Sequence, residues 1–116
     1  MENEKFIQHL ENILARIKSL AWSKAKEYAP GDDRYHNFNV VARKLAAIGV
    51  ETNDNILLAI MGLKFKHTVS IDDIVKQALT NKNDTSQAML DEKFGDELLY
   101  LVLAYSWLSY TTMGDK

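Results

Sequence analysis

The residue types best suited to holding an anion gather around one expected helix-loop-helix corner, between residues 24 and 38. This segment carries basic side chains, an amide and several carboxylates, and Arg34 can bind a phosphate through two parallel N–H groups. The candidate ligand-binding residues in the segment are Lys24, Glu27, Tyr28, Arg34, His36 and Asn37. The alternative is a solvated turn with surface charges, because charged loops are common.

A second candidate pair lies further along the chain. Lys64 and His67 are three residues apart and therefore share one face of a helix. A role in ligand binding requires Lys64 to face inward beside Ile60 and Leu63. The alternative is electrostatic, because we expect a helix to end near residue 67, and cations are favoured at a helix C-terminus.

A third group forms a stripe on the last expected helix. Glu92, Asp96 and Tyr100 are spaced four apart. Carboxylates at this spacing repel each other, so a divalent metal or basic side chains should compensate them. Asp96 precedes an apolar stretch and should lie at the edge of the core, where a carboxylate must be paired or bound to a metal. A salt bridge to Lys64 or Arg34 and a ligand-binding role both remain open.

Helical periodicity and a single proline predict an all-α fold of four to five helices, in one domain over residues 1–116. The first helix should run over residues 3–28 and end before Pro30. The second should carry an apolar face from residue 38 to residue 48, with Gly49 as its C-terminal cap.

The later helices are predicted from capping residues. Thr52, Asn53 or Asp54 should cap a third helix that ends near residue 67. Ser70 with Asp73 resembles a capping box and predicts a short fourth helix as far as residue 79. A polar loop over 80–86 should precede the last helix, over 87–110.

The second half of that last helix is apolar almost all round, from Leu98 to Tyr110. Four other helices in so small a domain can cover only part of such a surface. We therefore expect a dimer or a larger homo-oligomer.

Composition excludes several classes of protein. The net charge of −2 argues against a binder of duplex nucleic acid, which would carry a basic excess. The chain has no cysteine, so disulfides and thiolate metal sites are excluded. The longest apolar run, from Leu98 to Leu108, is about half a membrane span, so we expect no membrane insertion. No signal peptide is visible, and we expect a cytoplasmic protein.

The three candidate segments together resemble small phage-encoded helical proteins related to the MazG-like nucleoside triphosphate pyrophosphohydrolases, and among these the nucleotide-modification-associated group. The resemblance spans about three-quarters of the chain. The matching motifs are Lys24-x-x-Glu27-Tyr28-Ala29, Asp33-Arg34-Tyr35-His36-Asn37-Phe38, Lys66-His67 with Ser70-Ile71, and Glu92-Lys93-x-Gly95-Asp96 leading into Leu99-Tyr100-Leu101.

This resemblance implies a MazG-like helical bundle that dimerises, with a nucleotide site between helices. The catalytic members hold Mg²⁺ with a Glu-x-x-Glu pair and a later Glu-x-x-Asp pair. Here Asp96 matches the final aspartate, but Lys93 replaces the glutamate three residues earlier, and Lys24 stands at the position that should pair with Glu27. A site with these lysines would hold Mg²⁺ poorly and could instead neutralise a phosphate directly.

Three functions follow in order of preference. The first is a protein that binds a phosphorylated small molecule, a nucleotide, without hydrolysing it and without a cofactor. For this function Lys93 is a further candidate ligand residue. Sequestration of a host nucleotide signal in the host cytoplasm would suit a phage-encoded protein. The second is an Mg²⁺-dependent nucleoside triphosphate pyrophosphohydrolase, with Glu27, Glu92 and Asp96 as metal ligands. The third is a helical adaptor or oligomerisation protein.

Overall fold

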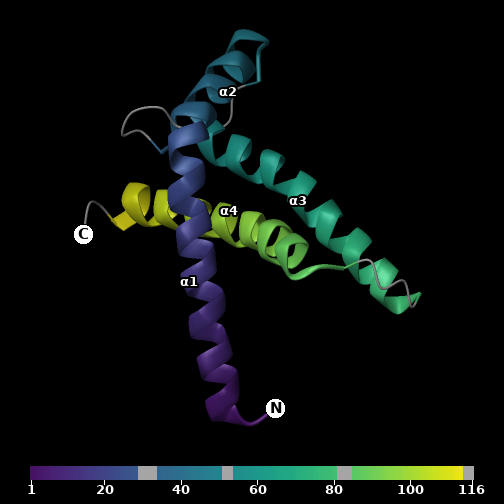
Figure 1. The fold of residues 1–116 in the computed structure, drawn as a ribbon. Coiled ribbons are helices and arrows are strands. Elements are labelled where there is room, and N and C mark those ends of the chain that lie inside the picture. Colours follow the sequence, from purple (N-terminus) through teal and green to yellow (C-terminus); the bar gives the residue numbers. More distant parts are fainter. Residues whose placement is uncertain (29–33, 51–53, 81–84, 114–116) are drawn as a thin grey trace.

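The computed structural model describes residues 1–28, 34–50, 54–80 and 85–113. These residues form four helices and no strand: α1 (Asn3–Tyr28), α2 (His36–Ala47), α3 (Asn55–Leu79) and α4 (Gln87–Met113). In Figure 1 α4 lies at the centre and α1 crosses it steeply. α3 packs on α4, in the most extensive contact between two helices of the described chain. The prediction of an all-α fold is confirmed.

The first two helices lie where the periodicity predicts them. α1 is continuous from Asn3 to Tyr28. α2 ends in a Schellman motif, in which the Gly49 N–H donates to the Ala46 carbonyl (3.0 Å) and the Val50 N–H donates to the Leu45 carbonyl (2.9 Å). Gly49 has a φ of 89°, a left-handed conformation that glycine adopts without strain.

The third helix differs from its prediction. Asp54 caps it, with Oδ1 accepting from the Leu57 N–H at 3.0 Å, whereas Thr52 and Asn53 lie outside the described residues. The predicted break after His67 is wrong, because α3 continues to Leu79. The Ser70 hydroxyl donates to the Lys66 carbonyl at 3.2 Å and does not cap a new helix. No proline interrupts this stretch, and extending a helix costs less than nucleating another.

The last helix begins at its predicted position and ends three residues later than predicted. The Ser86 hydroxyl accepts a hydrogen bond from the Met89 N–H at 3.1 Å and so caps the N-terminus of α4. The helix then runs to Met113. No described helix is long and apolar enough to cross a membrane.

The main core lies where α2, α3 and α4 meet. Its buried members are Phe38, Ala59, Ile60 and Ala104. Asp54 connects α3 to α4 beside this core. Its Oδ1 caps α3, and its Oδ2 accepts a hydrogen bond from the Trp107 indole N–H at 2.5 Å. α1 packs mainly on α4, where Gly95 leaves room for the Leu20 and Ile17 side chains. The glycine therefore sets how closely α1 approaches α4.

The whole arrangement is open. Its radius of gyration is 16.7 Å, whereas a compact domain of this length has a value of about 13 Å. The N-terminal half of α1 extends beyond α4 without lying on another helix (Figure 1).

Candidate functional site

Charged side chains from three helices meet where α1, α3 and α4 cross. We call this cluster the polar centre; it consists of Lys24, Lys64, His67, Thr68, Asp96 and Glu97. Among the described residues, every buried side-chain nitrogen or oxygen has a hydrogen-bond partner. The polar centre is therefore an organised network, and it connects α1 to the pair of α3 and α4 that carries the main core.

Asp96 is the central carboxylate of the network. Its Oδ1 pairs with the Lys24 ammonium of α1, and its Oδ2 lies 3.7 Å from the His67 Nδ1 of α3. The side chain of Asp96 is only 12% exposed. The 3.7 Å separation is too long for a hydrogen bond, so the carboxylate acts on His67 through its negative charge. Asp96 thus links three helices, but it pairs with Lys24 and not with Lys64 or Arg34, the two partners considered from the sequence.

Glu97 makes a separate set of contacts with α3. Its Oε1 accepts from the Lys64 ammonium at 2.5 Å and from the Thr68 hydroxyl at 2.9 Å. Lys64 is only 14% exposed and shares a helix face with the fully buried Ile60. It therefore faces inward, which is the orientation that a role in ligand binding would require, although Leu63 is 40% exposed and faces outward.

An aromatic wall borders the polar centre. The His67 ring lies 4.8 Å from the Tyr100 ring, and Tyr100 meets Phe38 edge to face at 5.8 Å. Tyr35 continues the wall and donates its hydroxyl to the Leu103 carbonyl at 3.2 Å. Burial raises the pKa of Tyr35, so its hydroxyl remains a donor at neutral pH.

Burial, hydrogen bonds and neighbouring charges shift the pKa values of His67 and Glu97 in the polar centre. Burial lowers the pKa of His67, and the positive charges of Lys24 and Lys66 lower it further, against the opposing effect of Asp96. The imidazole is therefore neutral at pH 7. Burial alone would raise the pKa of Glu97, but the hydrogen bonds from Lys64 and Thr68 outweigh it and lower the pKa. Glu97 therefore carries its negative charge at neutral pH.

Other predicted ligand residues lie elsewhere. Arg34 is exposed and donates to the Ala21 carbonyl at 3.3 Å. His36 and Asn37 are exposed on α2. The side chains of Glu27 and Tyr28 lie outside the described part of the chain.

Glu92, the first member of the predicted carboxylate stripe, points outward. Lys93 pairs with Glu92 at 3.9 Å, and the Glu92 side chain is 56% exposed. Among the described residues, Lys93 thus pairs with its own neighbour, whereas Asp96 pairs with Lys24. Among the described residues, no group of three or more histidine and acidic side chains is placed to hold a metal ion. Glu27, the third metal ligand of the hydrolase alternative, lies outside the described side chains.

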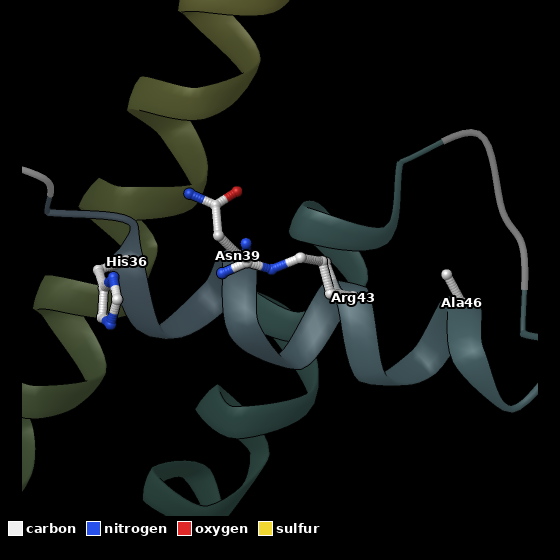
Figure 2. Close-up of a pocket in the computed structure, with 5 residues that line it drawn as sticks. His36, Asn39, Arg43 and Ala46 are labelled. Carbon is white, nitrogen blue, oxygen red and sulfur yellow. The ribbon is translucent and has the colours of Figure 1, made fainter.

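A shallow hollow of about 390 Å³ lies on the outer face of α2. Figure 2 shows His36, Asn39, Arg43 and Ala46 in sequence along this helix. Ala42 completes the lining. His36 thus belongs to this separate surface and not to the polar centre.

Sequence reasoning missed Thr68 and Glu97. Thr68 is four residues after Lys64 and therefore lies on the same helix face, but the predicted end of the helix at residue 67 hid this relation. Glu97 follows Asp96 directly, and adjacent residues on a helix point about 100° apart, so a neighbouring helix must lie close to engage both. That condition depends on the crossing of α3 and α4.

Comparison with known proteins adds no relative. No protein-family model, curated protein or solved structure matches the chain. The function must therefore be argued from the polar centre and the surface.

Proposed function

We propose that this protein binds a phosphorylated small molecule of the nucleotide type at the polar centre, without hydrolysing it. The observation that carries the proposal is the convergence of Lys24, His67 and Asp96 from three helices at a partly buried crossing. Burying ion pairs seldom stabilises a fold more than apolar packing of the same volume does. A cluster of this kind with perturbed pKa values is a candidate functional site.

The available groups match the parts of a nucleotide. The ammonium groups of Lys24 and Lys64 and the Thr68 hydroxyl can donate to phosphate oxygens. The neutral imidazole of His67 can donate one hydrogen bond and accept another, and Asp96 can accept from a ribose hydroxyl. Binding would exchange the Lys24–Asp96 pair for a Lys24–phosphate pair. Because one ionic contact replaces another, the cost of releasing Lys24 is largely recovered.

Thermal-shift and calorimetric titrations with nucleoside mono-, di- and triphosphates, each with EDTA or with Mg²⁺, test this proposal. We expect one nucleotide to raise the melting temperature in EDTA, because a ligand that binds only the folded state stabilises it by mass action. The nucleotide should be recovered unchanged. No binding by any nucleotide would contradict the proposal.

Matched lysine variants localise the ligand. Lys24→Ala should weaken binding by roughly tenfold or more, because a charge-assisted hydrogen bond contributes about 1.5–3 kcal/mol. Lys18→Ala, which removes an exposed lysine of the same helix, should not. Lys64→Ala and its exposed neighbour Lys66→Ala form the second pair. Equal losses from Lys24→Ala and Lys18→Ala would place the ligand elsewhere.

The hydrolase alternative has its own decisive result. Mg²⁺-dependent release of pyrophosphate from a nucleoside triphosphate, lost in Asp96→Asn, would replace the binding proposal with an enzymatic one. Glu27 would then be the next residue to change, because Glu92, another proposed metal ligand, is exposed and paired with Lys93.

Self-association is the second part of the proposal, and the surface area supports it. The chain exposes 8789 Å², whereas a compact protein of this mass exposes about 6,400 Å². The excess of roughly 2,400 Å² is comparable to what each subunit buries in a large obligate dimer. Light scattering at micromolar concentration should return twice the 13.2 kDa of the chain or more. A stable 13.2 kDa particle would contradict self-association.

A further inference from the structure

Two apolar stripes with heptad spacing lie partly bare on the molecule. The first is on α1, where apolar side chains recur at steps of four and three residues: Phe6, Leu10, Ile13, Ile17 and Leu20. Its C-terminal end is covered by α4, because Ile17 is buried and Leu20 approaches Gly95. Its N-terminal end is not, since Phe6 is 52% exposed. The stripe of α1 is therefore covered by α4 at its C-terminal end and left exposed at its N-terminal end.

The second stripe is on α4 and repeats the same spacing. Its members are Phe94, Leu98, Leu101, Tyr105 and Leu108, all of them exposed by 38–75%. The opposite face of α4 packs against the core through Ala104 and Trp107. α4 therefore has one covered apolar face and one bare apolar face. An apolar stripe at steps of three and four residues is the face by which a helix packs on a neighbouring helix.

The overhang of α1 extends the α4 contact outward. Ile17 and Leu20 lie on α4 at Gly95. Phe6 and Leu10 continue the same face of α1, and the N-terminal half of α1 extends beyond α4 (Figure 1). A helix placed beside α4 in that space would meet both stripes at once. The required length is that of α4 itself, which has 27 residues.

The composition of the α4 stripe favours a second copy of this chain as the occupant. An uncharged stripe can pack on its own copy about a two-fold axis, because such a contact places the same residues of both chains opposite one another. The segment from Leu98 to Met113 of α4 contains no charged residue, so two copies can approach there without repulsion.

We propose that a second copy of this chain packs on these two stripes about a two-fold axis, so that each α1 lies with its C-terminal half on its own α4 and its N-terminal half on the partner's α4. This inference rests on the self-association proposed above, and it is independent of ligand binding at the polar centre. The excess surface of roughly 2,400 Å² per chain is sufficient for such an interface. The two α1 helices run antiparallel, as do the two α4 helices.

Because the chain contains no cysteine, single cysteines report this geometry cleanly. Leu10→Cys and Leu101→Cys proteins, unfolded, mixed in equal amounts, refolded together and mildly oxidised, should give a disulfide-linked dimer containing one chain of each kind. Leu10→Cys mixed with Val75→Cys is the matched control, because Val75 is 45% exposed but lies on α3 away from both stripes. That mixture should give no mixed dimer.

Charged substitutions provide a second measurement. Phe6→Glu and Leu101→Glu should each raise the dimer dissociation constant by roughly tenfold or more, because they place a carboxylate in a desolvated seam. Circular dichroism should stay helical, since both side chains are about half exposed in the single chain. Val75→Glu, the control on α3, should leave the dissociation constant unchanged.

The outcomes separate the two levels of the proposal. A dimeric particle that forms no mixed disulfide between the two variants and resists both glutamates would overturn this interface and leave self-association standing. A monomeric particle would overturn both. A helical partner from another protein that binds the monomer through the same two stripes would also overturn the assignment of a second copy.

Discussion

At the scale of single residues, one carboxylate connects three helices. Asp96 of α4 contacts Lys24 of α1 and lies near His67 of α3, so it engages both neighbours of its own helix. Among the described side chains, Arg16 and Asp91 form a second ion pair between α1 and α4, at 3.1 Å. The polar centre therefore has a structural role in addition to the proposed binding role.

The structural role predicts a stability cost for Asp96→Asn. This change leaves the Lys24 ammonium, which is 22% exposed, without its charged partner. We expect a loss of about 1–3 kcal/mol in the free energy of unfolding, below the range for a fully buried pair. Asp91→Asn, which breaks the more exposed pair, should cost less than about 1 kcal/mol. Urea titrations measure both, and equal costs would contradict a special role for Asp96.

The neutral His67 predicts a loss of stability in mild acid. Burial lowers the pKa of His67 below its usual value of 6.5, so the folded state binds fewer protons than the unfolded state. Its stabilising contribution is complete above pH 6.5 and is lost as the pH falls through the folded pKa. Glu97, whose pKa is also lowered, adds a further loss below pH 4.5. Chemical denaturation from pH 8 to pH 5 should show the first effect.

Two histidine variants identify the source of this pH dependence. His67→Gln should flatten the stability profile above pH 5, because the titrating group is gone. His9→Gln removes an exposed histidine of α1 and should leave the profile as it is. If both variants keep the parent profile, another group is responsible.

At the scale of elements, α4 organises the fold because it is apolar on more than one face. Tyr100 and Trp107 pack on the core that α4 shares with α2 and α3, whereas Gly95 lies at the crossing with α1. A helix with this distribution has no single polar side, which is why its packing requires neighbours on several sides.

Two glycines in helices should respond to substitution in opposite directions. A Cβ at Gly62 of α3 would meet nothing within 4 Å, so Gly62→Ala should stabilise the protein by about 0.5–1 kcal/mol through helix propensity. A Cβ at Gly95 would lie 3.3 Å from Leu20 Cδ2. Gly95→Leu should therefore force α1 away and cost about 1–3 kcal/mol, although leucine favours helices. Thermal unfolding of both variants checks the pair, and a stabilised Gly95→Leu would contradict the close crossing.

At the scale of the whole molecule, the open shape leaves much apolar surface for another chain to cover. In the described part of the chain the buried core is small, and Ile60 is the only large side chain there that is fully buried. A core of this size contributes little surplus over the entropy lost on folding. Association would therefore supply part of the stability of each chain.

Stability that depends on association must depend on protein concentration. For a dimer that unfolds to monomers, the melting temperature should rise as the concentration increases from about 1 to 100 μM. The Leu101→Glu variant should lose this dependence and melt at a lower temperature, because its seam is disrupted. A melting temperature independent of concentration in the parent protein would contradict coupled folding and association.

The sequence by itself determined the features that depend on neighbours a few residues away. The apolar period predicts α1, and a glycine after the last apolar residue predicts the end of α2. Polar residues before α3 predict a cap at Thr52, Asn53 or Asp54, and the structure has it at Asp54. These features involve hydrogen bonds or side-chain faces within one or two helical turns, so the local sequence is sufficient. The break predicted at Ser70 failed because a capping pattern does not stop a helix that can continue.

Only the tertiary structure decided which charges meet. Lys24 and Asp96 are 72 positions apart, and helix spacing ranks no basic residue above another as the partner of Asp96. That choice depends on the angle at which α1 crosses α4, which Gly95 and Leu20 set through their close approach. The same crossing leaves the N-terminal half of α1 bare, because a straight helix of 26 residues cannot follow the surface of one central helix that it meets steeply.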